Sequence, residues 1–235
     1  MDFILKALGE AIRLILHPDR EVIGITGLSL FIGIAAVLGA LIAALPIASF
    51  LALKKSFPLK GFFLNIFNTL MGLPPVVAGL ALYLVLSRSG PLGPLGLLYT
   101  PWAMLIAQFV LAFPIIAALS HSAIMGVPPA VSDAARTLGA SPLQHGLTII
   151  HEARFGIFSS IMAAFGRVMA EVGAVLIVGG NIKGYTRVMT TTIALETDKG
   201  EFELAMALGI VLLAIGLLVN FSLYFFQKKG GRLWA

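Results

Sequence analysis

The chain has 235 residues, of which 59% are hydrophobic and 11% charged, and its formal net charge is +5. Soluble domains are typically about a quarter charged and expose few large apolar patches, so this composition excludes a soluble fold and predicts an integral membrane protein. The absence of cysteine excludes disulfides and thiolate metal ligands. The small positive charge is typical of cytoplasmic loops rather than of nucleic-acid binding, so we expect no nucleic acid among the partners.

Residues 1–20 are predicted to form an amphipathic helix rather than a span. Polar residues recur every three or four positions, at Asp2, Lys6, Glu10, Arg13 and His17. This spacing places them on one face of a helix, with apolar side chains on the others. We interpret the segment as an interfacial helix in contact with membrane lipid, and the alternative is a helix packed on the rest of the protein.

Five apolar runs follow, each long enough to cross a bilayer at about 20 residues per span. They are residues 22–53, 62–88, 101–120, 156–179 and 202–226. The first is overlong, which predicts a tilt, a kink near Pro46 or an extension beyond the lipid. The second contains Pro74-Pro75, a break that neighbouring helices or a cavity must satisfy. Residues 21–235 are therefore predicted to form an all-α, multi-pass transmembrane domain.

The positive-inside rule gives an orientation. With five spans, loops 54–61 and 121–155 and the C-terminal tail share one side. Both sides carry nearly equal numbers of Lys and Arg, but three lysines fill the short loop 54–61 and two more follow the last span. Because short loops and span ends count most, this side is predicted to be cytoplasmic. The N-terminus and loop 180–201 are then outside, and the C-terminus is cytoplasmic.

The cytoplasmic loop 121–155 contains a compact polar segment. Ser132 or Asp133 can cap a helix through "AARTLG", and Gly139 can end it. Ser141-Pro142 can start a second helix. Two short helices with an Ala-rich face form a knob that fits a groove in another protein, so the segment predicts a docking element.

This segment resembles the EAA loop of permease subunits of ATP-binding-cassette importers. The family pattern is Glu-Ala-Ala, three residues, Gly, nine residues and Ile-x-Leu-Pro. Asp133-Ala134-Ala135 matches its start, Gly139 its glycine and Ile149 its isoleucine, whereas His151 and Glu152 replace Leu-Pro. The resemblance implies a type I importer permease bundle whose loop docks into a separate ATPase. The coupling-loop residues so assigned are Asp133, Ala134, Ala135, Leu138, Gly139, Ser141, Pro142 and Ile149.

A second stretch, from Arg167 on, is similar to oxyanion importers for molybdate, tungstate and sulfate. It contains the run Gly180-Asn181-Ile182-x-Gly184-x-Thr186, and the following "TTTIALETDKGEFELA" looks most like the tungstate branch. The resemblance implies a homodimeric pore, two ATPase subunits that carry ATP and Mg²⁺, and an extracytoplasmic oxyanion-binding protein. It implies no cofactor in this chain. Molybdate or sulfate is the alternative cargo.

Polar residues near the spans give candidates for the translocation path. Arg167 and Glu171 are four apart, which predicts that they share one face of the fourth span. They form either an ion pair that fixes helix packing or a polar point on the path or its gate. Asn181 is a further candidate for the path or its gate. With Lys183, Arg187 and the hydroxyls of residues 190–192, it either contacts the anion transiently or belongs to an ordinary external loop. Gln108 is predicted to make an interhelical hydrogen bond.

Enzyme motifs are missing from the sequence. It has no P-loop, so we expect ATP hydrolysis on a partner subunit, and it has neither Gly-x-Ser-x-Gly nor the zinc motif His-Glu-x-x-His. We predict no catalytic residue and no metal site. The rival hypothesis is a stand-alone secondary transporter or channel, which needs its own coupling site in the spans. Only Arg167 and Glu171 are available for that role.

Overall fold

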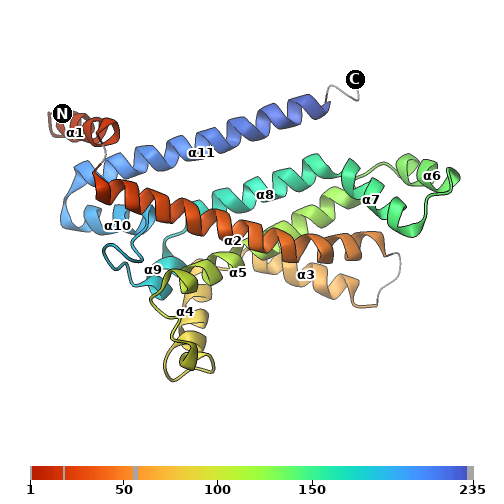
Figure 1. Cartoon of the computed structure of the whole chain (residues 1–235), viewed down its shortest axis with the longest axis horizontal. Helices are drawn as coiled ribbons and strands as arrows, with labels where there is room; N and C mark the ends of the chain where they lie inside the picture. Colours follow the sequence, from red (N-terminus) through yellow and green to blue (C-terminus); the bar gives the residue numbers. More distant parts are fainter. Residues whose placement is uncertain (1, 18, 55–57, 232–235) are drawn as a thin grey trace.

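The structure is a computed structural model that describes residues 2–17, 19–54 and 58–231. Within this part the chain forms a bundle of helices of very unequal length (Figure 1). Lys55, which supports the predicted orientation, lies outside the described residues. The helices are α1 (Asp2–Leu16), α2 (Arg20–Leu53), α3 (Lys60–Met71), α4 (Pro75–Leu86), η1 (Gly93–Leu95), α5 (Pro101–Met125), α6 (Pro129–Thr137), α7 (Pro142–Glu152), α8 (Arg154–Met169), α9 (Gly173–Gly179), α10 (Met189–Lys199) and α11 (Phe202–Gly231).

Helices α2, α5 and α11 are the long elements of the bundle. Among the described residues these three are long and apolar enough to cross a membrane, and two bent pairs raise the number to five if each pair is one span. The five predicted apolar runs therefore all appear as helical segments. Helix α2 continues through Pro46 for 34 residues. At about 1.5 Å per residue it exceeds the roughly 30 Å hydrocarbon core, so it extends beyond the lipid or tilts.

Alanines hold α2 against α5, its main partner. Ala36, Ala40, Ala44 and Ala48 recur every four residues and are fully buried. Residues four apart share one face of a helix, and small side chains on that face let two backbones approach closely. This contact forms the largest core of the molecule, to which α8 and the start of α11 add apolar side chains.

Two of the predicted spans, 62–88 and 156–179, are bent, and the sequence predicts a break only in the first. Helices α3 and α4 meet at 104°, and α8 and α9 meet at 59°. Pro75 explains the first bend, because proline has no N–H to donate and its ring clashes with the preceding turn. The predicted break at Pro74-Pro75 is confirmed. The second bend, over residues 170–172, contains no proline.

The two bent pairs meet through their second helices, α4 and α9. A Cβ at Gly79 would lie 2.7 Å from the Cα of Ala174, so only glycine permits this approach. Ala78, Val175 and Val178 pack there with Met104 of α5 in a second core. Helix α4 projects sideways from the long helices (Figure 1).

The short helices occupy opposite ends of the bundle. Helices α6 and α7 lie at one end, and α1 and α10 lie at the other (Figure 1). Helix α1 packs on α11 and buries Ala11, while its position in the membrane interface stays a prediction. The segment 180–201, predicted as a loop, contains α10, which packs on α11.

Candidate functional site

The first candidate site is the knob, which we define as residues 128–152, comprising α6, α7 and their connection. Helix α6 begins at Pro129, so the predicted cap at Ser132 or Asp133 is wrong. Proline suits this position because the first N–H of a helix has no partner within the helix. The predicted end at Gly139 is confirmed: its φ is +79°, and its N–H donates to the carbonyl of Arg136 at 2.9 Å. A left-handed glycine is the usual signal that ends a helix.

The second helix of the knob starts where the sequence predicts. Ser141 and Gln144 form a capping box: Ser141 Oγ accepts from the Gln144 N–H at 3.4 Å, and Gln144 Oε1 accepts from the Ser141 N–H at 2.9 Å. Pro142 takes the first helical position. At the other end only Ala153 separates α7 from α8. Because no Leu-Pro interrupts the chain at His151 and Glu152, the knob leads almost directly into a span.

The knob has an anchored base and an exposed tip. Ile149 is 6% exposed and packs with Ile124, Ala153 and Ile157 at the end of the bundle. Leu138 and Leu143, at the tip, are 88% and 73% exposed. Two large apolar side chains exposed on a polar segment make the tip a candidate contact surface for another protein.

A hydrogen bond ties the two helices of the knob together. Ser132 Oγ on α6 and His145 Nε2 on α7 are 2.9 Å apart. Sequence reasoning missed this pair, because the two residues share no motif and meet only once the chain turns at Gly139. The remaining predicted coupling residues flank the tip: Asp133 and Ala134 are exposed, and Ala135 is half-buried.

The second candidate site is the bend between α8 and α9. Helix α8 ends at Met169, so Arg167 and Glu171 do not share a helix face, and that prediction is wrong. No ion pair joins their described side chains. Glu171 is 3% exposed, and its Oε1 accepts from the Ala174 N–H at 2.9 Å. The carboxylate therefore caps α9 instead of pairing with the arginine.

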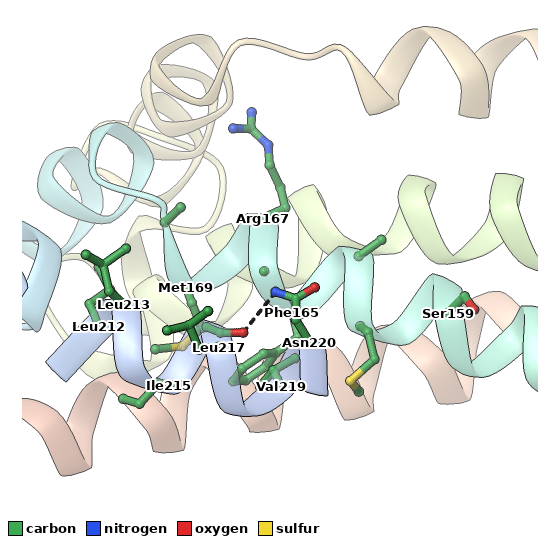
Figure 2. A pocket seen from close by; sticks show the side chains of 15 residues that line it. Ser159, Phe165, Arg167, Met169, Leu212, Leu213, Ile215, Leu217, Val219 and Asn220 are labelled. Atoms are coloured by element: carbon green, nitrogen blue, oxygen red, sulfur yellow. Dashed lines mark hydrogen bonds between the residues drawn. The ribbon is translucent and has the colours of Figure 1, made fainter. Parts of the chain in front are cut away.

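Arg167 lines a groove of about 590 Å³ between α8 and α11. Figure 2 shows its guanidinium pointing away from α11, while Leu217 and Asn220 face α8. Asn220 Nδ2 donates to the carbonyl of Gly216 at 2.9 Å (Figure 2). Arg167 is the charged residue in a lining that is otherwise apolar or neutral. Its place on the translocation path stays a prediction.

Asn181 and the threonines after it hold the segment 180–192 together. Asn181 has a φ of +49°, and its Oδ1 accepts from Thr191 Oγ1 at 2.9 Å. Thr190 Oγ1 donates to the carbonyl of Glu171 at 2.7 Å, and Thr192 Oγ1 donates to that of Val188 at 2.7 Å. All three threonines are buried, and the bond from Thr190 to Glu171 holds the start of α10 next to the bend. A role of Asn181 in the path stays a prediction.

Gln108 makes the predicted interhelical hydrogen bond, from its Nε2 on α5 to the carbonyl of Val168 on α8, at 3.3 Å. Ser29 makes a second connection that the sequence did not reveal, since its Oγ accepts from the Met189 N–H at 2.8 Å. Both bonds tie α8 and α10 to the central pair of long helices. They hold the helices around the bend in place and do not involve Arg167 or Glu171.

These features, a knob beside a bundle with bent spans, define a class of membrane protein. Residues 44–230 match the family described as binding-protein-dependent transport system inner membrane component. The match covers most of the chain, so the chain belongs to this family of ABC importer permeases. It is accordingly a multi-pass inner-membrane protein and a transporter subunit.

Individual relatives narrow the class. The chain is 39% identical to the tungstate uptake system permease protein TupB of Peptoclostridium acidaminophilum, over 97% of this chain and 100% of that protein. It is 45% identical to a probable anion ABC transporter permease protein of Haloferax volcanii, over 84% of this chain and 87% of that protein. Among solved structures, the inward-facing MetNI methionine ABC transporter matches with a TM-score of 0.69 at 16% identity, over 86% of this chain and 92% of that chain. This likeness confirms the predicted all-α importer-permease fold.

Proposed function

We propose that this chain is the permease subunit of an importer for a tetrahedral oxyanion, with tungstate as the first candidate. Two copies form the pore, and two separate ATPase subunits bind ATP and Mg²⁺. The observation that carries the proposal is the knob: an anchored pair of short helices with exposed leucines, at one end of a family member that has no nucleotide-binding motif. Such a surface fits a cleft on a partner protein.

The knob transmits motion because it is rigid and directly connected to a span. Ser132 and His145 brace its two helices, and Ile149 fixes its base. Only Ala153 lies between α7 and α8, so a displacement of the knob moves α8. Helix α8 ends at the bend over residues 170–172, where a rigid movement becomes a change of angle relative to α9. Closure of the ATPase dimer would thereby switch the pore from inward-open to outward-open.

The bend is also the proposed gate. Glu171 lies in it, Arg167 lies just before it, and Asn181 lies after α9 on the segment that Thr190 joins to the bend. An extracytoplasmic binding protein would deliver the anion to the outer side of the permease, where the segment 180–201 is predicted to lie. Tungstate, molybdate and sulfate are all tetrahedral dianions, so selection among them is assigned to the binding protein. The chain is 39% identical to a tungstate uptake permease over the whole length of that protein, which supports tungstate as the first candidate.

Reconstitution tests this proposal. The permease, its ATPase and its binding protein are incorporated into proteoliposomes, and uptake of tungstate is measured with and without ATP. We expect uptake only with all three components and ATP, and competition by molybdate weaker than by unlabelled tungstate. Uptake by the permease alone without ATP would contradict the proposal and support the stand-alone transporter.

A further inference from the structure

A pocket of about 450 Å³ lies at the end of the bundle opposite the knob. It is formed by the first turns of α2 and by the segment 183–187. Three cationic side chains line it, Arg20, Lys183 and Arg187, together with one acidic side chain, Glu21. Arg20 and Glu21 are the charged residues of a 34-residue helix that is otherwise uncharged.

Two of the cations converge on the single carboxylate. Lys183 Nζ is 2.8 Å from Glu21 Oε2, and Arg187 Nη1 is 3.6 Å from Glu21 Oε1. The second distance is longer than the roughly 2.7–2.9 Å of a charge-assisted hydrogen bond. The Arg187 side chain is 13% exposed, and its buried Nε has no hydrogen-bond partner. A guanidinium held away from water needs acceptors, and Glu21 supplies too few of them.

The segment that carries Lys183 and Arg187 is rigid. The carbonyl of Ile182 accepts from the N–H groups of Tyr185, Thr186 and Arg187 at 3.0 to 3.1 Å. Buried Thr186 donates through Oγ1 to the carbonyl of Gly179 at 2.6 Å and accepts from the Ile182 N–H at 2.9 Å. The backbone positions of the two cationic residues are therefore fixed without a ligand, which lowers the entropy lost on binding.

We propose that this pocket is a transient binding site for the oxyanion at the extracytoplasmic entrance, and that the Glu21 carboxylate occupies the anion position while the pocket is empty. A tetrahedral dianion brings twice the charge of Glu21 and four acceptor oxygens for the under-satisfied Arg187. Competition from a tethered carboxylate keeps binding weak, as release into the pore requires. The inference rests on the proposed function, which sets the orientation and the cargo.

A free anion fits this pocket better than the acidic surface of a partner protein does. The guanidinium of Arg187 is recessed, and Gly24, Ile25 and Leu28 form walls beside it. A small ion can enter such a recess, whereas a protein surface reaches mainly the exposed Arg20 and Lys183. Delivery by a binding protein and capture by the pocket are separate events in this scheme.

The test measures tungstate binding to the full-length permease in lipid nanodiscs, without ATPase or binding protein, by equilibrium dialysis and elemental analysis. We expect Arg187→Gln and Lys183→Gln to lower the affinity by about three- to tenfold, the size of one lost ordinary hydrogen bond. Glu21→Gln removes the competing carboxylate and is expected to raise the affinity. Lys199→Gln is the matched control, because Lys199 pairs with Glu196 away from the pocket, at 2.9 Å.

The expected changes in tungstate affinity, a rise in Glu21→Gln and a fall in Arg187→Gln, distinguish an anion site from a structural brace. A brace would lower the thermal midpoint in Glu21→Gln and Arg187→Gln alike, with no effect on tungstate binding, and would overturn the inference. So would a wild-type permease that binds no tungstate, or variants that weaken only the affinity for loaded binding protein. ATP-dependent uptake by the complete importer is measured in parallel. If uptake persists without tungstate binding, the pocket assignment fails alone; if both are missing, the proposed function fails too.

Discussion

At one end of the molecule the tip of the knob leaves Leu138 and Leu143 largely exposed, whereas at the other end Thr186 and Thr191 are buried and hydrogen-bonded within the chain. The knob is held to the bundle through an apolar base around Ile149. The opposite end is fixed by hydroxyl groups that satisfy backbone carbonyls and N–H groups. The hydroxyl groups at one end therefore find their partners within the chain, whereas the leucines at the other end are left uncovered. Substitutions in the knob should therefore mainly lower transport, and substitutions at the opposite end should mainly lower thermal stability.

The largest effect on transport is expected from Gly139→Trp. A bulky residue at the tip obstructs docking and should reduce uptake by about tenfold or more, the size of a lost interface hot spot. The φ of +79° strains any side chain, so the thermal midpoint should fall modestly, although nothing lies within 4 Å of a Cβ placed there. Gly96→Trp is the matched control, since Gly96 also has a positive φ and open space around it but lies far from the knob. Equal loss of uptake in both variants would contradict the docking role.

The largest effect on stability is expected at the other end, from Thr186→Val. The substitution leaves the carbonyl of Gly179 and the N–H of Ile182 without their buried partner, at a cost of about 2 kcal/mol. Thermal unfolding in detergent measures the shift. Thr197→Val serves as control, because Thr197 is exposed and makes a similar bond to the carbonyl of Ile193. Similar shifts in both variants would show that burial of the hydroxyl does not matter.

A smaller effect is expected at the bend, from two substitutions of Glu171. Glu171→Leu removes the acceptor for the Ala174 N–H and should lower stability by about 1 to 2 kcal/mol. Glu171→Gln keeps an acceptor oxygen and should retain most of the stability and most of the uptake. Thermal unfolding and ATP-dependent uptake are measured for both. A stable Glu171→Gln variant that cannot transport would show that the path needs the charge itself.

The smallest effect is expected from the brace within the knob. Ser132→Ala and His145→Ala each remove the bond between α6 and α7, which is worth about 1 kcal/mol. The expected result is a modest rise in ATP hydrolysed per anion transported, with the complex still assembled. Thr137→Val provides the comparison, because Thr137 bonds only within α6, to the carbonyl of Asp133. An unchanged ratio in both Ser132→Ala and His145→Ala would remove the brace from the coupling mechanism.

The sequence predicts the knob well because its signals are local. A left-handed glycine and a Ser-Pro helix start each depend on a few neighbouring residues, and both are confirmed at Gly139 and Ser141. The start of α6 was misplaced because Pro129 at the first helical position outweighs Ser132 and Asp133 as candidate caps.

The bends and the pocket depend on contacts between distant segments. An apolar run shows that a segment is helical and embedded, but the bend over 170–172 follows from packing of α9 on α4 at Gly79 and Ala174. The carboxylate of Glu171 then caps α9, so its spacing from Arg167 misled the prediction. Glu21 and Arg187 lie far apart in the sequence, and no local pattern pairs them.

Cross-linking from the tip of the knob tests the central claim most directly. The chain has no cysteine, so Leu138→Cys provides a unique attachment point for a maleimide photo-cross-linker. The labelled permease is purified from membranes that contain its ATPase, and the products are identified by mass spectrometry. The account predicts an adduct with the ATPase from Leu138→Cys and none from Leu95→Cys, an exposed leucine away from the knob. No adduct from Leu138→Cys, or equal adducts from both positions, would contradict it.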